Sequence, residues 1–219
     1  MATFQDKPAD NIARAAWAPV GPIAGDFDFA GWKTAKPIHI TRYWSGEAAP
    51  VGRQADARIL WSEDALHVLY ACHQQEPLIV SSNPQTAEKT LGLWERDVCE
   101  IFIAPDPATP NNYFEFEAAP TGEWLDVAIQ FTEEGRQSDW EFQSQMSVAV
   151  KAVGPRFLIS MRIPWSLQIT KPRSGSLWRA NFFRCVGRGP GRGYLAWQPT
   201  LTEEPNFHVP AVFGSLRFD

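Results

Sequence analysis

Apolar and polar residues alternate with a period of two along most of this chain. Residues 57–61 lead through a short polar turn into residues 66–72, where every even-numbered residue from Leu66 to Cys72 is apolar. This spacing predicts a β-hairpin with one face in the core, because successive side chains of a strand point to opposite sides. The same alternation predicts further strands at 38–43, 97–104, 112–119, 123–129, 147–153, 156–163, 178–185, 194–198 and 212–218.

Clusters of turn-forming residues separate these segments, as at 105–107 (Pro-Asp-Pro) and 119–122 (Ala-Pro-Thr-Gly). About ten short strands joined by turns are typical of all-β sandwiches. The fold class that we expect is therefore an antiparallel β-sandwich of jelly-roll or immunoglobulin-like type. One helical turn is expected at 164–167, because Pro164 suits a first helical position.

A chain of 219 residues suits a single β-sandwich domain over residues 1–219. No linker composition and no internal repeat interrupts it. Residues 1–35 and 74–93 are rich in loop-forming residues, and we expect 1–24 to be a loop-rich N-terminal segment.

Charge and hydropathy exclude two classes of partner. The formal net charge of −5 repels phosphate backbones, so no nucleic acid is expected to bind. No apolar run approaches the ~20 residues of a membrane span, so no membrane partner is expected. Residues Met1 to Arg14 lack the continuous apolar stretch of a signal peptide. The sequence as it stands therefore predicts a cytoplasmic protein, or an extracellular or periplasmic one if a leader was removed.

The three cysteines, Cys72, Cys99 and Cys185, lie within apolar, strand-like runs. An odd number of cysteines cannot close a disulfide framework, and no two of them have metal-site spacing. We expect buried, reduced thiols that pack as small hydrophobic groups.

Two segments combine aromatic residues with polar neighbours. Residues 93–103 (LWERDVCEIFI) place Trp94 before an acidic turn and a strand, and residues 207–214 (FHVPAVFG) lie near the C-terminus. With further elements in order between about Gly25 and Phe218, the chain resembles carbohydrate-binding module family 9, and more closely the family-9-like proteins of the wider DOMON-like set. The resemblance implies a protein that covers the C–H face of a sugar with aromatic rings and binds its hydroxyl groups with carboxylates and donors.

In well-described members of that family, one sugar unit lies between two tryptophans, and a glutamate on the neighbouring strand binds its hydroxyl groups. The resemblance places the first tryptophan at Trp94 and the glutamate at Glu100. The second tryptophan falls on Phe207, whose ring is smaller. A basic residue of the following strand falls on Glu115, which reverses the charge.

The strand after Trp94 places its odd-numbered residues, Cys99 to Ile103, on one apolar face and Glu100 on the other. A carboxylate on a half-apolar face is unfavourable unless it meets a cation, a donor or a ligand. Arg184 or Arg96 could supply the cation. A salt bridge that closes the sheet and a ligand contact therefore both remain open for this glutamate.

Ten tryptophans cannot all line one site. Trp61, Trp165 and Trp178 are assigned to packing, as most tryptophans of a β-sandwich are. Trp94, in a polar loop, and Trp197 are kept as ligand candidates.

Glu115 and Glu117 alternate with Phe114 and Phe116, which predicts phenylalanines inside and glutamates on the opposite face. Residues two apart on a strand are separated by roughly 7 Å, near the spacing of glycosidase carboxylate pairs. A solvated acidic face explains the pattern better, because alternation alone produces such pairs. If the protein is an enzyme, Glu100, Glu115 and Glu117 would be the catalytic residues of a hydrolase acting on O-glycosyl compounds.

Metal and haem signals are weak. Relatives often hold structural calcium in loops, but the candidate carboxylates here are scattered and match no loop signature: Asp26, Asp28, Glu63 and Asp64. Some DOMON-like relatives hold b-type haem with methionine and histidine. The three methionines, Met1, Met146 and Met161, show no pairing with a histidine.

Two further features lie near the expected site. His208 follows Phe207, and either a sugar hydroxyl or a neighbouring loop could be its hydrogen-bond partner. The glycine-rich segment 187–193 joins two strands and so predicts a flexible connection rather than a phosphate cradle, with arginines that could overhang a binding face.

These observations predict a non-catalytic protein that binds a short glycan or a glycan chain end and is associated with carbohydrate catabolism. The expected carbohydrate-binding residues are Trp94, Glu100, Arg184, Trp197, Phe207 and His208. Structural calcium stays open as a cofactor, and no other cofactor is expected.

Overall fold

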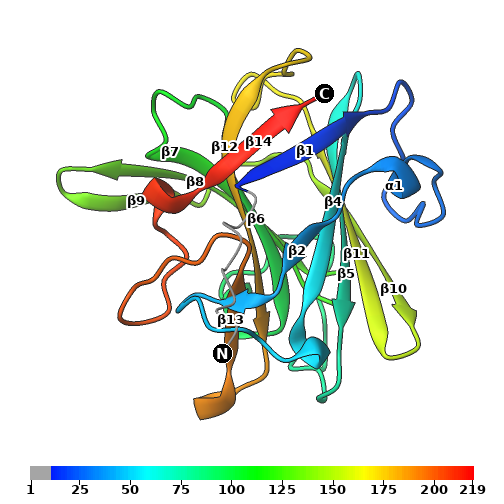
Figure 1. The fold of residues 1–219 in the computed structure, drawn as a ribbon, viewed down its shortest axis with the longest axis vertical. Helices are drawn as coiled ribbons and strands as arrows, with labels where there is room; N and C mark the ends of the chain where they lie inside the picture. Colours follow the sequence, from blue (N-terminus) through cyan, green and yellow to red (C-terminus); the bar gives the residue numbers. More distant parts are fainter. Residues whose placement is uncertain (1–10) are drawn as a thin grey trace, which may run out of the picture.

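The chain forms one strongly curled, mixed β-sheet with little helix (Figure 1). The computed structural model describes residues 11–219. The strands are β1 (Ile12–Trp17), β2 (Ile38–Ile40), β3 (Arg42–Tyr43), β4 (Ala55–Trp61), β5 (Ala65–His73), β6 (Val98–Ala104), β7 (Asn112–Ala118), β8 (Trp124–Thr132), β9 (Gly135–Asp139), β10 (Ser147–Val153), β11 (Arg156–Pro164), β12 (Leu177–Val186), β13 (Gly193–Ala196) and β14 (Gly214–Phe218). Their order is β10-β11-β5-β4-β1-β14-β12-β6-β7-β8-β9, with β2 beside β4, β13 beside β12 and β3 beside β13.

Helical structure is short. It consists of the α-helix α1 (Gly31–Thr34) and the 3-10 turns η1 (Val51–Arg53), η2 (Leu93–Glu95), η3 (Gly189–Gly191) and η4 (Pro210–Val212). None of the helices within residues 11–219 is long and apolar enough to cross a membrane. The mostly-β class is therefore confirmed.

Strand β1 makes the sheet mixed rather than purely antiparallel. It runs parallel to β14, with Ala13 opposite Leu216, and parallel to β4, with Ala16 opposite Leu60. The other strand pairs are antiparallel, as expected. No tight turn joins β1 to either neighbour, so local turn chemistry does not set its direction. The jelly-roll or immunoglobulin-like type stays a prediction.

Several local predictions are confirmed and three are wrong. The hairpin of β4 and β5 forms as expected, with Leu60 opposite His67. The expectation of loop over 1–24 is wrong at β1, whose alanines hide the strand because alanine has low β-propensity; residues 1–10 lie outside the described part of the chain. Polar strand β9 was not predicted. The helical turn at 164–167 is absent: β11 continues to Pro164, opposite Ala65.

The main core lies between facing parts of the curled sheet. One side comes from β4, β5 and β11 and the other from β6, β7 and β12. Cys72 and Cys99 meet across it with their sulfurs 3.3 Å apart. The even-numbered face of β5 is buried here, as the alternation predicts, and so are Trp61 and Trp178, with Trp165 packed against them. All three cysteines are free and buried, which confirms that prediction.

A second apolar cluster covers the opposite face of β6, β7, β8 and β12. It includes Val98, Phe102 and Phe183, and residues Phe207 and Phe213 pack onto it from the C-terminal segment that is orange to red in Figure 1. Every residue of β6 is consequently buried. This second cluster encloses the face on which Glu100 lies.

Candidate functional site

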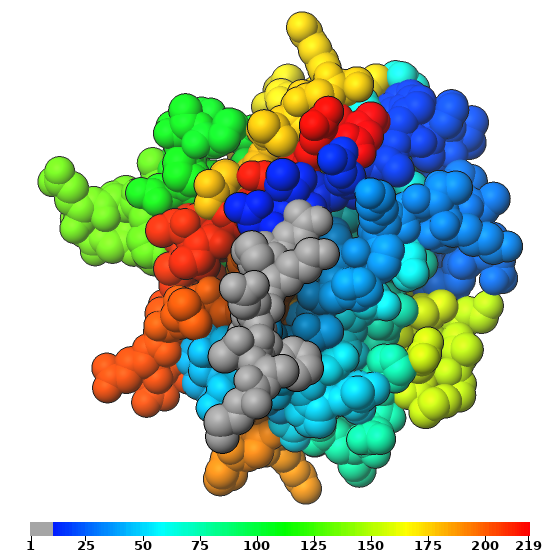
Figure 2. Space-filling view, in the orientation of Figure 1, coloured from blue at the N-terminus to red at the C-terminus, as the bar shows by residue number. Residues whose placement is uncertain are grey.

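A pocket of about 530 Å³ opens beside the second cluster. The β8–β9 hairpin, light green, and the orange segment near residue 205 project from the same side of the molecule (Figure 2). Both contribute to the lining, which consists of Trp94, Glu95, Glu100, Glu115, Ile129, Arg136, Ser138, Trp140, Cys185, Arg192, Tyr194, Pro205, Asn206, Phe207 and His208. This volume is within the usual range for a small-molecule site. The structure thus brings together Trp94, Glu100, Phe207 and His208 of the expected binding residues.

Two exposed tryptophans form the rim of the pocket. Trp94, in η2, is 41% exposed, and Trp140, just after β9, is 39% exposed. Their ring centroids lie 6.0 Å apart at an interplanar angle of 33°. Trp140 was missed in the sequence, although it occupies a polar stretch as Trp94 does. Such exposed indoles leave flat apolar faces in contact with water, which a ligand with an apolar face can cover.

Phe207 forms a fixed wall rather than a free platform. Its ring stacks on Phe183 with centroids 4.1 Å apart at 14°, and Tyr194 contacts it edge-on at 6.1 Å. One face of Phe207 is therefore already covered by protein. Tyr194, also missed in the sequence, borders the pocket beside it.

The structure does not bring Trp197 to this pocket. Its ring packs on Phe182 at 5.6 Å within the main core. It also lies against Gly214, where an added Cβ would sit 2.4 Å from the indole. Trp197 is a packing residue that requires glycine at position 214.

Arg184 is also absent from the pocket, and the expectation that it or Arg96 would pair with Glu100 is wrong. Arg184 is opposite Cys99 in the β12–β6 register, so its side chain leaves the sheet on the other face from Glu100. It donates hydrogen bonds to the carbonyl oxygens of Arg53, Gln54 and His73 at 2.7–3.0 Å. Arg96 pairs instead with Glu123 at 2.7 Å.

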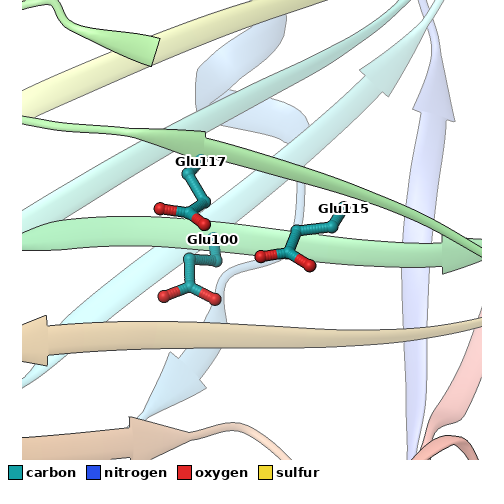
Figure 3. A group of neighbouring side chains, drawn as sticks. All are labelled: Glu100, Glu115 and Glu117. Carbon is teal, nitrogen blue, oxygen red and sulfur yellow. The ribbon is translucent and has the colours of Figure 1, made fainter. Parts of the chain in front are cut away.

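Three buried glutamates lie close together (Figure 3), and two of them, Glu100 and Glu115, line the pocket. Glu100 on β6 is opposite Glu117 on β7, and Glu115 is opposite Phe102, so all three side chains leave the same face. One carboxylate oxygen from each lies within 4.8 Å of the others. The expectation of a solvated acidic face is wrong, because the second cluster covers this side of β7. The prediction that Phe116 points into the main core is confirmed.

Burial dominates the electrostatics of these glutamates. It raises the pKa of Glu100 and Glu117 well above the usual range, and the neighbouring carboxylates raise both further. Burial likewise raises the pKa of Glu115 to about 7, although its hydrogen bond with Glu117 opposes the shift. Two carboxylates cannot donate to each other, so that contact requires a shared proton. The raised pKa values favour the protonated forms, so the negative charge of the cluster is neutralised either by protons or by a bound cation.

Two arginines, Arg136 and Arg192, line the pocket, and the second is held by other partners. Arg192, in the loop after β12, donates to the carbonyl oxygens of Trp94, Glu95 and Arg96 and lies 5.2 Å from the ring centre of Tyr194. It therefore fixes the loop that carries Trp94. The interpretation of segment 187–193 as a connection whose arginines reach the binding face agrees with this position of Arg192.

His208 hydrogen-bonds the hydroxyl of Tyr113 through Nδ1 at 2.8 Å and lies 4.0 Å from Glu115. Burial, with a smaller contribution from Arg136, lowers the pKa of His208 to about 3. The imidazole is therefore neutral near pH 7 and does not balance the charge of Glu115.

The loop carboxylates considered for calcium do not gather. Glu63 pairs with Lys171 and Asp64 with Arg162, each at 2.5 Å, while Asp28 lies 3.5 Å from Lys151. The methionines considered for haem are equally remote from such a role: Met146 and Met161 are buried in the main core, and Met1 lies outside the described residues.

A β-rich chain with an aromatic rim over buried carboxylates has the architecture of a small-ligand binding protein. Residues 23–219 match the family described as carbohydrate family 9 binding domain-like, and the chain belongs to that family. A curated relative, an "Extracellular protein" of Arthroderma benhamiae, is 24% identical over 140 residues, which cover 58% of this chain and 62% of the relative. The match thus spans less than two thirds of that protein.

Solved structures share the fold. A candidate carbohydrate-binding protein from Bacteroides uniformis is 18% identical with a TM-score of 0.74, covering 95% of this chain and 99% of the other. A family 9 carbohydrate-binding module from Caldicellulosiruptor kristjanssonii in complex with cellotriose is 16% identical, with a TM-score of 0.64 and coverage of 94% and 93%. Its glucose complex is 17% identical, with a TM-score of 0.62 and coverage of 94% and 95%.

Proposed function

We propose that this protein binds a short glycan or a glycan chain end in the pocket under Trp94 and Trp140, without transforming it. The observation that carries the proposal is the exposed tryptophan pair above a floor of carboxylates. Family membership supports it, and so do the cellotriose and glucose complexes of the structural neighbours.

The lining suits the two kinds of surface that a sugar presents. The indole faces can cover the C–H surface of a pyranose ring, and this contact removes apolar area from water. Glu100, Glu115 and Asn206 offer oxygens to hydroxyl groups on the inner side of the pocket. A pocket of about 530 Å³ suits a terminal or short ligand better than a long chain.

The arrangement of the glutamates favours binding over hydrolysis. Glycosidases place their two carboxyl groups on either side of the scissile bond, about 5 Å or more apart. Here the oxygens of Glu100, Glu115 and Glu117 crowd within 4.8 Å on one side, and Glu117 does not line the pocket. We therefore place the protein among ligand-capturing proteins of carbohydrate catabolism.

A glycan array on the purified chain tests the proposal, followed by isothermal titration with the strongest ligand. We expect saturable binding of oligosaccharides and no turnover of a panel of aryl glycosides. Turnover that disappears in Glu100→Gln would instead establish a hydrolase. A protein that binds no glycan on the array would contradict the proposal.

A further inference from the structure

We propose that Glu100, Glu115 and Glu117 hold a divalent cation of the calcium class at the floor of the pocket. Their carboxyl groups point toward a common space (Figure 3), and one oxygen from each lies within 4.8 Å of the others. Calcium–oxygen bonds of about 2.3–2.6 Å place opposite ligands roughly 5 Å apart. One ion can therefore contact all three side chains while the strands keep their register.

The burial of Glu117 is a second observation that points to a ligand, beside the convergence of the three carboxyl groups. Its side chain is fully buried and directed into the cluster, and neither of its oxygens accepts a hydrogen bond from a donor among residues 11–219. A buried carboxylate without a donor is strongly unfavourable unless it is protonated or binds a cation. The same face of the sheet carries two more carboxylates, so a cation satisfies all three at once.

The positive charge of the protein at the pocket comes from Arg136 and Arg192, whose charges partly offset the rise that burial causes in the pKa of Glu115 and Glu100 without pairing with either glutamate. Within the described part of the chain, no lysine or arginine forms a salt bridge with the three glutamates. Glu100 contacts the thiol of Cys185 at 3.5 Å, and the imidazole of His208 is 4.0 Å from Glu115 but bonded to Tyr113. These contacts leave the three carboxylates without an ion-paired lysine or arginine among the described residues, so we assign the balancing charge to a bound cation.

Charge and geometry favour a divalent metal over a protonated amine. Three carboxylates with a divalent ion leave one net negative charge, whereas an ammonium group leaves two in a buried site. Magnesium binds at about 2.0–2.1 Å with strict octahedral geometry and keeps its waters, so the wider and more flexible calcium shell fits this cluster better. This position differs from the loop carboxylates, which are engaged in ion pairs.

The coordination positions left free by the protein face the pocket. Glu100 and Glu115 line it, whereas Glu117 does not. Sugar hydroxyl groups could complete the shell from the pocket side; this extension rests on the proposed carbohydrate function, whereas cation binding itself does not.

The test uses the full chain, treated with EDTA and then transferred to chelator-free buffer. Calcium binding is measured by isothermal titration, by terbium luminescence excited through tryptophan, and by the change in melting temperature. Glu117→Gln preserves size and removes one charge, and Glu133→Gln makes the same change at an exposed residue outside the cluster. Glycan binding is measured separately in calcium and in EDTA.

We expect one saturable calcium site in the wild type and in Glu133→Gln, a higher melting temperature with calcium, and affinity at least about ten-fold weaker in Glu117→Gln. Without calcium, Glu117→Gln should be as stable as the wild type or more so, because a buried charge is gone.

The proposal would be overturned if the wild type shows no heat of calcium binding, no terbium luminescence and no change in melting temperature with calcium. This outcome is decisive even if Glu117→Gln fails to fold. Unchanged calcium affinity in a folded Glu117→Gln would overturn it too, as would tighter binding of glucosamine than of glucose in EDTA with no calcium binding. Calcium binding without any glycan binding would support the cation site and contradict only the carbohydrate function.

Discussion

Replacing Trp94 by alanine tests the aromatic rim most directly. The change removes one ring of the pair at 6.0 Å but keeps the backbone carbonyl to which Arg192 donates, so the loop retains its anchor. Stacking of a ring on an aromatic side chain contributes about 1–3 kcal/mol in nucleic-acid binding, and a pyranose on an indole should be comparable. Since ~1.4 kcal/mol is a factor of ten, glycan affinity should fall about ten- to a hundred-fold.

Stability should hardly change, because Trp94 is 41% exposed and its ring packs on Trp140, which is itself 39% exposed. Surface substitutions usually alter the free energy of unfolding by less than about 0.5 kcal/mol. In a chain of this size, that corresponds to a shift of roughly 2 °C or less in the melting temperature.

The assay is isothermal titration with the strongest array ligand, combined with thermal unfolding. Trp17→Ala is the matched control, because Trp17 is 39% exposed and does not line the pocket. Its affinity should equal that of the wild type. Wild-type affinity in Trp94→Ala would refute the role of the rim. A large fall in melting temperature would show that Trp94 belongs to the core.

Four further outcomes are expected. Trp140→Ala should weaken glycan binding by a similar factor, and the double variant with Trp94→Ala should lose less than the sum of the two changes, because contacting residues are not additive. Arg184→Met should lower the free energy of unfolding in urea by about 3 kcal/mol or more, since it removes the donors of three carbonyl oxygens; an unchanged midpoint would contradict that role. Burial lowers the pKa of His67 from 6.5 to about 4, so the unfolded chain takes up the proton first and stability should fall as the pH drops from 6.5 to 4, by about 2–3 kcal/mol. Urea titrations across this range should show a weaker fall in His67→Gln, and identical curves would refute the assignment. The cysteine thiols should react with a thiol reagent only after unfolding, and fast labelling of the native protein would contradict their burial.

The local alternation of apolar and polar residues determined much of the secondary structure of this protein. Alternation identified the buried face of β5 and the core-facing residues of β6, because a strand has a period of two whatever its partners are. The resemblance to family 9 implied a shared site for Trp94, Glu100 and Phe207, with His208 beside them, and all four residues line one pocket.

Tertiary structure decided which side chains are buried and which of them meet in the pocket. These properties depend on which strands pair and on what covers each face of the sheet. The pattern of Glu115 and Glu117 is the same for an exposed and a covered face, and only the cluster packed on β7 makes those carboxylates buried and raises their pKa. The register of β12 against β6 sends Arg184 away from Glu100, and β1 takes its place beside β14 through contacts about 200 residues apart. Trp140 lies beside Trp94 although the first follows β9 and the second belongs to η2, which is distant in the sequence. Long-range pairing carries no signature in short segments of sequence, and the pocket is assembled by that pairing.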